Sequence, residues 1–207
     1  MPAYGALKDP VDARDYPFSA ARLVPKAEVL PKEAFVDFAT LPAPRDQLGL
    51  GACTAFAAAM VREILIRRMA PDTTKRLSPL HLYYEARKIQ GWELQDSGSY
   101  LRDAFKAMAD VGVATEDTWP YDTTKFRDAP PSGVYAEAKR YRIYVYRRLA
   151  DTQEMMACLA AGFPCAISMA VYSNFFPLGG IQYLDKVPEG ETPAGGHSVT
   201  LVGYQIT

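Results

Sequence analysis

The chain has 207 residues, of which 49% are hydrophobic and 23% are charged, and its formal net charge at pH 7 is −1. These values are typical of a globular protein with one large core or two small lobes, and the charge indicates no nucleic-acid partner and no membrane partner. No apolar run approaches the roughly 18–20 residues of a membrane span. The first residues, MPAYGALKDPVDARD, show no signal peptide, so the compartment stays open between a reducing cytoplasm and export by a non-standard route.

The N-terminal part of the chain is rich in proline, and a helix follows it. Residues 1–45 contain seven of the 16 prolines, so we expect no long helix there but an extended segment on the surface. Residues 53–69, CTAFAAAMVREILIRRM, predict a helix. Phe56, Met60 and Ile64 recur at intervals of four residues, which favours one buried face.

Three further helices are expected. Residues 78–90 predict one with Ser78 as N-cap and Pro79 in the first helical position. Residues 99–111 predict another, closed by Gly112. A short helix is expected over residues 152–161.

Strands are expected in the later part of the chain. Residues 165–171, CAISMAV, read as a buried strand, and residues 197–204, HSVTLVGY, as a strand with Val199 and Leu201 on one face. The stretch 141–146, YRIYVY, is rich in β-forming residues but alternates too loosely to be assigned. Because helices come first and strands later, the order predicts an α+β fold with two lobes.

The cysteines are the first candidates for chemistry. Cys53, Cys158 and Cys165 cannot all pair, and their spacing matches no zinc motif, so we expect no metal site. Cys158 and Cys165 lie in apolar contexts and are expected to be buried and unreactive. Cys53 lies where a glycine-containing turn, QLGLGA, leads into a helix, whose N-terminal amides favour a thiolate.

A nucleophilic thiol needs a base, and the chain has two histidines. His81 lies in the middle of a predicted helix among apolar residues, so we expect it to pack or to form a local hydrogen bond. His197 follows the flexible pair Gly195–Gly196 and opens a strand, a position at the edge of a lobe that suits a residue facing a cleft. Cys53 and His197 are therefore the candidate pair.

Two segments resemble the papain-like cysteine peptidases. QLGLGAC-x-AF is similar to their nucleophile segment, Q-G-x-C-G-S-C-W-A-F, with Gln47 six residues before Cys53 as in that family. GGHSVTLVGY is similar to their histidine strand, G-H-A-V-x-x-V-G-Y. Cys53 and His197 are 144 residues apart, which matches the spacing of about 130–150 residues in the family. Further segments, among them LPKEAFVDFATLPAPRDQ and SGSYLRDAFKAMADVGVATEDTWPY, extend the resemblance over residues 30–204.

The resemblance implies a papain-like fold with two lobes. Residues 1–29 would form an N-terminal extension. Residues 30–130 would form a mainly helical lobe that carries Cys53, and residues 131–207 a mainly antiparallel β lobe that carries His197.

The resemblance also implies a cysteine endopeptidase that needs no cofactor and acts on peptides or proteins. Cys53 would form a thioester intermediate, with His197 as general base and then acid. The side-chain amide of Gln47 and the backbone N–H of Cys53 would bind the oxyanion. Along residues 98–101, Gly98 and Ser99 would bind the substrate backbone, and Tyr100 and Leu101 would line the main specificity pocket.

Three residues depart from the family motifs. Thr54 replaces the tryptophan that follows the nucleophile, which predicts poorer shielding of the site from water. Ser99 replaces a glycine, which predicts a less close approach of the substrate backbone. Leu50 replaces the cysteine that usually forms a disulfide near the nucleophile, as is typical of intracellular or bacterial members.

The third catalytic group of the family is missing. The family orients its histidine with an asparagine that follows in an N-S-W-G-like segment, but no Asp, Glu or Asn follows His197, and Asn174 precedes it. We expect the chain to be a truncated piece of a longer enzyme with an incomplete β lobe, rather than a natural short form, because strand 197–204 would otherwise have an unpaired edge.

Two alternatives stay open on function. A catalytically weak or inactive papain-like module that binds extended peptides or a partner protein is the alternative to an active peptidase. Residues 1–29 are expected to lie across the cleft and to limit substrate access, and the alternative is that they only add packing.

Overall fold

The computed structural model describes residues 4–13, 15–18, 30–175, 187 and 189–206. The strands are β1 (Ala6–Leu7), β2 (Glu33–Phe35), β3 (Ser99–Tyr100), β4 (Cys165–Val171), β5 (Gly195–Leu201) and β6 (Gly203–Gln205). The α-helices are α2 (Cys53–Met69), α3 (Pro79–Lys88), α4 (Leu101–Asp110), α5 (Ser132–Ala138) and α6 (Thr152–Ala160). Short 3-10 helices lie at Phe38–Thr40, Thr123–Lys125, Lys139–Tyr141 and Ser173–Phe175.

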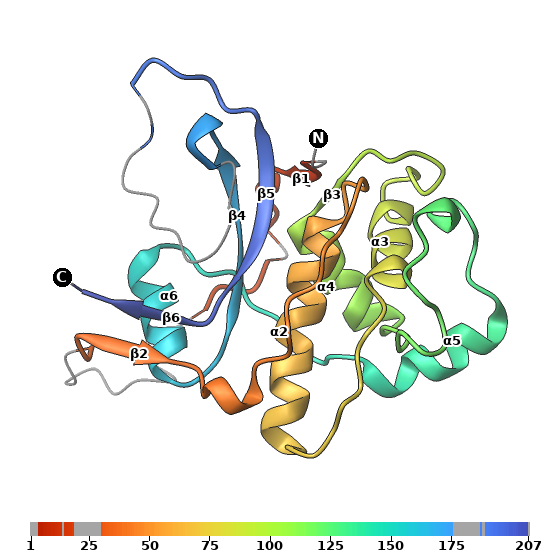
Figure 1. Ribbon diagram of the computed structural model, residues 1–207, viewed down its shortest axis with the longest axis horizontal. Helices are drawn as coiled ribbons and strands as arrows, with labels where there is room; N and C mark the ends of the chain where they lie inside the picture. Colours follow the sequence, from red (N-terminus) through yellow and green to blue (C-terminus); the bar gives the residue numbers. More distant parts are fainter. Residues whose placement is uncertain (1–3, 14, 19–29, 176–186, 188, 207) are drawn as a thin grey trace.

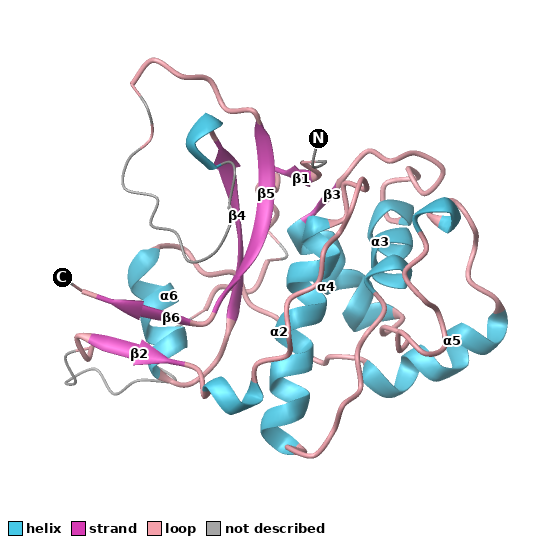
Figure 2. Ribbon diagram, in the orientation of Figure 1, coloured by secondary structure: helices cyan, strands magenta, loops and turns pink. Residues whose placement is uncertain are grey.

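These elements form two halves that meet along α2 (Figure 1). Helices α3, α4 and α5 lie on one side of α2, and strands β2, β4, β5 and β6 with helix α6 lie on the other (Figure 2). Within the described ranges, the strands form three two-stranded sheets: parallel β1–β3, antiparallel β2–β6 and antiparallel β4–β5. The architecture is the expected α+β fold with two lobes.

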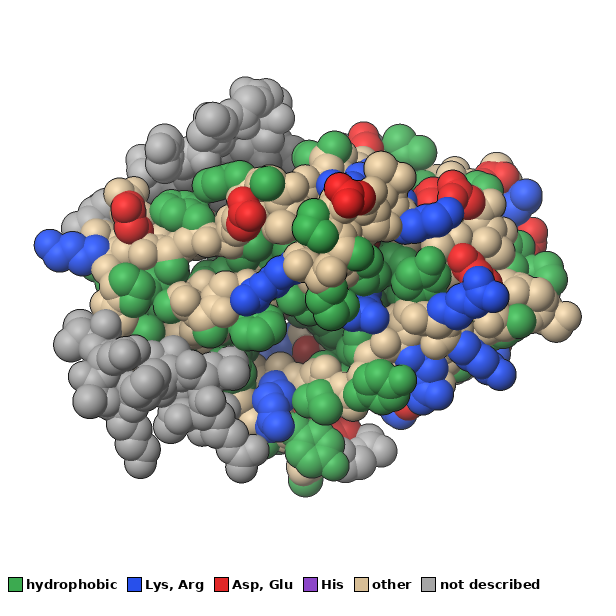
Figure 3. Space-filling model, turned by 90° about the horizontal axis from the view of Figure 1, so that it is seen from below, with side chains coloured by type: hydrophobic (Ala, Val, Ile, Leu, Met, Phe, Trp, Pro, Cys, Tyr) green, Lys and Arg blue, Asp and Glu red, His purple; other side chains and the backbone are tan. Residues whose placement is uncertain are grey.

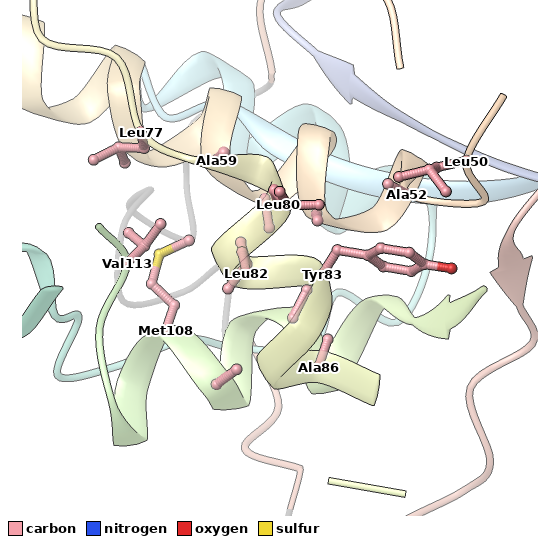
Figure 4. Close-up of a cluster of buried hydrophobic side chains, with 14 residues drawn as sticks. Leu50, Ala52, Ala59, Leu77, Leu80, Leu82, Tyr83, Ala86, Met108 and Val113 are labelled. Atoms are coloured by element: carbon pink, nitrogen blue, oxygen red, sulfur yellow. The ribbon is translucent and has the colours of Figure 1, made fainter. Parts of the chain in front are cut away.

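The helical half has a core of small and aliphatic side chains. Leu80, Leu82 and Tyr83 of α3 pack against Met108 of α4 and against alanines of α2 (Figure 4). Helix α3 begins as predicted, because the Ser78 side chain accepts a hydrogen bond from the His81 amide and Pro79 takes the first helical position.

Helix α2 has the predicted bounds, but the expectation of one buried face is wrong. Its alanines pack into the helical half, whereas Ile64 packs into a second core with α6 and β4. The helix is therefore buried on both sides, which requires the small residues of its first turns. Even Glu63 is buried, and its carboxylate is paired with Arg45 at 2.8 Å and with Arg76 at 2.9 Å.

The β half is built around β4 and β5. Strand β4 spans the predicted residues, and its register with β5 pairs Met169 with His197. The strand expected over 197–204 begins two residues earlier, at Gly195, and is interrupted at Val202. The interruption has a physical cause, because β5 pairs with β4 whereas β6 pairs with β2, and the Val202 carbonyl accepts a hydrogen bond from Val36.

Other expectations are corrected near the junction of the halves. Helix α4 begins at Leu101 rather than at residue 99, because β3 is extended and pairs with β1. The stretch 141–146 forms no strand, and Tyr144 within it is 93% exposed. Helix α5 was not expected, and it packs on the helical half through Val134. The division of the chain near residue 130 stays a prediction.

The described residues 4–13 and 15–18, which we call the N-terminal strap, cross from the site of β3 to the β half. The strap begins in β1, and Pro17 forms a bridge with Arg148. Phe18 is buried in the second core, and Asp15 pairs with Arg102 at 3.1 Å and with Arg148 at 3.2 Å. This part of the chain is extended, as its prolines predict. In the described part of the chain, no helix is both long and apolar enough to cross a membrane.

Candidate active site

Cys53 is the first residue of α2, at the junction of the two halves. It is 1% exposed, and the backbone groups of Ser198 and Gly5 form hydrogen bonds with its sulfur. Ser198 follows His197 directly on β5, so the fold brings the helix that carries Cys53 against the strand that carries His197. Gly5 belongs to the strap, which therefore reaches the sulfur as well.

Burial, rather than the helix N-terminus, sets the state of the Cys53 thiol. Burial raises the pKa of Cys53, and the hydrogen bonds from the backbone of Ser198 and Gly5 only partly offset that effect. The expectation that the helix N-terminus favours a thiolate is therefore wrong for this conformation, in which the strap covers the sulfur. The thiol is held in its neutral form.

His197 is half-buried on β5 between two aromatic rings. Its ring centre lies 6.2 Å from that of Tyr4 and 5.9 Å from that of Phe175, and both contacts are edge-on. Burial lowers the pKa of His197 and so favours the neutral imidazole. Its Nδ1 atom is buried and has no hydrogen-bond partner among the described residues. No hydrogen bond joins this imidazole to the Cys53 sulfur within that set, although their elements are in contact.

Gln47 lies in the loop that leads to α2. Its side-chain Nε2 donates a hydrogen bond to the Leu50 carbonyl at 2.8 Å, and its backbone carbonyl accepts one from the Tyr121 hydroxyl at 2.6 Å. These bonds hold the loop before Cys53 in a fixed shape. The role of Gln47 in binding an oxyanion stays a prediction.

The predicted substrate loop holds the strap. The Ser99 amide donates a hydrogen bond to the Gly5 carbonyl at 2.8 Å, and Ala6 and Leu7 pair with Ser99 and Tyr100. Gly98 supports this approach with a φ of +71°, a conformation that favours glycine. The close approach takes place although Ser99 is not a glycine.

The two departures at Thr54 and Ser99 explain each other. Their hydroxyl oxygens lie 2.5 Å apart, and both residues are buried. The Ser99 side chain is thus directed into the helical half, toward α2, and leaves the backbone of β3 accessible to the strap. Sequence motifs alone could not reveal this pairing, because the two residues are far apart in the chain.

The strap fits the site so closely that only glycine suits the contact points. A Cβ atom on Gly5 would lie 1.8 Å from the Gly51 carbonyl oxygen, and one on Gly98 would lie 2.1 Å from the Gly5 oxygen. On the opposite wall, a Cβ atom on Gly196 would lie 2.0 Å from the Ala6 oxygen. The strap therefore contacts backbone of both halves.

A cavity of about 980 Å³ extends beside the strap, between the two halves. Leu101 lines it together with Ala6 and Leu7 of the strap and Met169 of β4, and the face of the molecule shown in Figure 3 is hollowed between hydrophobic side chains. Tyr100 instead packs against Trp92, with ring centres 5.9 Å apart.

Asp96 was missed by the sequence reasoning. Its Oδ1 atom accepts a hydrogen bond from the Gly51 amide at 3.0 Å. The only signal in the sequence is its place two residues before Gly98, which by itself identifies no role. In the ranges that the structure describes, no cluster of three or more His, Cys, Asp or Glu side chains could hold a metal ion.

Comparisons with known proteins agree with this geometry. The family described as "Papain family cysteine protease" matches residues 36–207. An uncharacterized peptidase C1-like protein of Acanthamoeba polyphaga mimivirus is 32% identical over 172 residues, which cover 77% of this chain and 55% of the relative. A cysteine protease of Blomia tropicalis is 28% identical over 77% of this chain and 48% of its own length. The chain thus spans about half the length of these curated relatives.

A solved structure extends the likeness to the strap. Xylellain, a cysteine protease from Xylella fastidiosa, superposes with a TM-score of 0.83 at 28% identity, covering 99% of this chain and 80% of that one. Together, the matching residues 36–207 and the shared architecture identify the chain as a member of the papain family of cysteine proteases.

Proposed function

We propose that the chain is the catalytic part of a cysteine endopeptidase and that the N-terminal strap holds it in an inhibited state. The observation that carries the proposal is the contact between the Cys53 sulfur and the backbone of Ser198, the neighbour of His197. This contact joins the helical half and the β half at the two residue types that thiol catalysis requires.

In the proposed reaction, His197 accepts the thiol proton of Cys53, and the thiolate attacks the carbonyl carbon of a peptide bond. The new C–S bond places negative charge on the carbonyl oxygen. When the C–N bond breaks, His197 returns the proton to the leaving amine, and a thioester remains. Water then attacks the thioester, and His197 takes a proton from the water and passes it to the departing sulfur. The carboxylic acid product leaves, and the thiol is restored.

The remaining site residues would bind the substrate. The backbone N–H of Cys53 and the side-chain amide of Gln47 would stabilise the oxyanion once Gln47 turns away from the Leu50 carbonyl. Gly98 and Ser99 would hold the substrate backbone through the groups that now hold Gly5, and Leu101 would contact a substrate side chain in the cavity. Tyr100, packed on Trp92, would form the wall behind it.

Self-inhibition follows from competition for the same groups. The Ser99 amide already donates to Gly5, and the strap lies on the Cys53 sulfur. A substrate can occupy this position only after residues 4–7 leave. Their departure would also expose Cys53 to water, which would lower the pKa of its thiol toward the ordinary value and favour the thiolate.

A binding module without activity is the alternative, and one observation favours it. Strand β3 already accepts an extended segment, while the Nδ1 atom of the His197 imidazole has no hydrogen-bond partner among the described residues. Such a module would bind peptides without turning them over.

The experiment compares the full chain with its Gly5→Ala variant. A Cβ atom at residue 5 would collide with the Gly51 backbone, so the strap cannot seat. The seat includes one hydrogen bond and the buried Ala6 methyl group, together about 2 kcal/mol. We therefore expect reaction of Cys53 with an epoxide thiol trap, and hydrolysis of fluorogenic peptides, to rise roughly 30-fold. Gly133→Ala, where a Cβ atom meets open space, is the matched control.

Each outcome has a distinct meaning. Equal rates for the full chain and Gly5→Ala would overturn self-inhibition. Absence of Cys53 labelling in Gly5→Ala, or labelling that His197→Ala does not reduce, would overturn the peptidase. Labelling that depends on His197 but yields no hydrolysis would favour the binding module.

A further inference from the structure

Two loops of the helical half meet beside the candidate nucleophile. One comprises residues 47–52 and leads into α2, and the other comprises residues 91–98 and leads into β3. All three cysteines of the chain are free, so no disulfide joins these loops. Their relative position therefore depends on non-covalent contacts.

Asp96 and Tyr83 form a hydrogen-bonded pair that receives one amide from each loop. The Asp96 Oδ1 atom accepts from the Tyr83 hydroxyl at 2.5 Å and from the Gly51 amide at 3.0 Å. The Tyr83 hydroxyl in turn accepts from the Gly98 amide at 3.1 Å. A single chain of hydrogen bonds thus runs from the loop before Cys53 to the loop before β3.

Tyr83 is a rigid base for this arrangement. Its ring is buried in the helical core, with the hydroxyl at the outer end of the cluster, on the side of Leu50 (Figure 4). The Arg87 guanidinium lies 3.9 Å from the ring centre and donates to the carbonyls of Glu93 and Gln95. Burial and the bond to Asp96 raise the pKa of Tyr83, so the hydroxyl stays a donor.

The fit around Gly51 shows how closely the loops are joined. A Cβ atom on Gly51 would lie 3.3 Å from Asp96 Oδ1, 3.4 Å from the Gly98 Cα and 3.2 Å from the Gly5 Cα. A second tie, between the hydroxyls of Thr54 and Ser99, lies one residue beyond Cys53. The nucleophile is therefore held on both sides in sequence.

We propose that Asp96 is a positioning residue of the active site and acts where a cross-link would otherwise be needed. Through Tyr83 and Gly51 it fixes the backbone before Cys53 relative to the backbone of β3 that binds the substrate. Thiol and bound peptide then keep one relative geometry, on which the rate of attack depends. The inference rests on the proposed peptidase activity for its kinetic consequence but not for its structural one.

The structural consequence is tested in the full chain by amide hydrogen exchange, measured by NMR. Asp96→Ala removes the acceptor of the Gly51 amide, and Tyr83→Phe removes the acceptor of the Gly98 amide while keeping the ring in the core. We expect exchange at the affected amide to rise at least about tenfold in each variant. Tyr135→Phe is the matched control, because it removes a similar bond, from a tyrosine hydroxyl to Glu85 at 2.6 Å, on the far side of α3.

The kinetic consequence is tested in the Gly5→Ala background, where the site is open. We expect Asp96→Ala to lower kcat/KM for peptides by at least about tenfold, mainly through kcat, because the reacting groups lose alignment. Asp96→Asn keeps the Oδ1 acceptor and should recover most of that loss. Tyr135→Phe should leave both constants unchanged.

The outcomes separate this inference from the proposed function. Unchanged exchange at Gly51 in Asp96→Ala would overturn the inference, as would unchanged kcat/KM in an active background. If the Gly5→Ala chain shows no peptidase activity, the proposed function fails, and exchange at Gly51 and Gly98 still decides whether Asp96 joins the two loops. Tyr83→Phe serves if Asp96→Ala does not fold.

Discussion

Lowering the pH from 7 to 5 should destabilise this chain through His81. The side chain is 0% exposed on α3, and neither ring nitrogen has a hydrogen-bond partner within the described residues. Its ring lies edge-on to Tyr135, with centres 5.6 Å apart. Burial therefore lowers the pKa of His81 from 6.5 to about 4, while the nearby charges of Glu137 and Lys88 act in opposite directions.

The sign follows from where the proton binds. Between pH 6.5 and about 4 the unfolded chain binds a proton at His81 that the folded chain does not, so the free energy of unfolding falls as the pH falls. The full effect is roughly 3 kcal/mol, reached below pH 4, and about 2 kcal/mol of it is lost by pH 5. Above pH 6.5 the contribution is complete.

Urea denaturation of the full chain and of His81→Leu, at pH 7, 6 and 5, measures this effect. Leucine has a similar size and no charge, so the fall in unfolding free energy between pH 7 and 5 should be about 2 kcal/mol smaller in the variant. The carboxyl groups whose pKa is raised by burial, such as Asp9 and Asp103, are common to both proteins and cancel in the comparison. The same pH dependence in both proteins would refute the reasoning.

Two other predictions concern buried polar groups. Thr54→Val should cost about 1–2 kcal/mol of unfolding free energy, because it leaves the Ser99 hydroxyl unpaired, and adding Ser99→Ala should cost less than the sum of the single changes; a double-mutant cycle by urea denaturation measures the coupling, and strict additivity would contradict it. Arg45→Ala should cost about 3 kcal/mol, since the buried Glu63 charge loses one of its partners, whereas Lys75→Ala, which breaks an exposed ion pair, should cost less than about 1 kcal/mol; equal losses in denaturation curves would contradict this difference.

Local signals predicted the elements that have strong boundaries of their own. The helix over 53–69 follows a glycine turn and carries apolar residues in every turn, and its bounds are as expected. The strand over 165–171 follows a glycine and a proline and is continuously apolar. Contacts between distant segments changed the remaining bounds, since residues 99 and 100 join a strand only because the strap pairs with them.

The candidate site was predictable in its residue types but not in its internal contacts. Motif spacing placed Cys53 and His197 on elements that are in contact in the structure. It treated Thr54 and Ser99 as two independent defects, although their hydroxyls are hydrogen-bonded to each other. It also predicted a favoured thiolate from the helix N-terminus, whereas the strap adds burial that outweighs this effect. Such outcomes depend on contacts across roughly half the chain.

The anchoring of the strap has a consequence for how dilution would affect the protein. Asp15 and Phe18 are fixed to the body of the molecule, and only a short connection separates them from residues 4–7. Occupancy of the cleft is then an intramolecular equilibrium, with an effective concentration on the order of millimolar. The seated fraction should not change with protein concentration, and a free peptide with the sequence of residues 4–7 would have to be added at about millimolar levels to replace it.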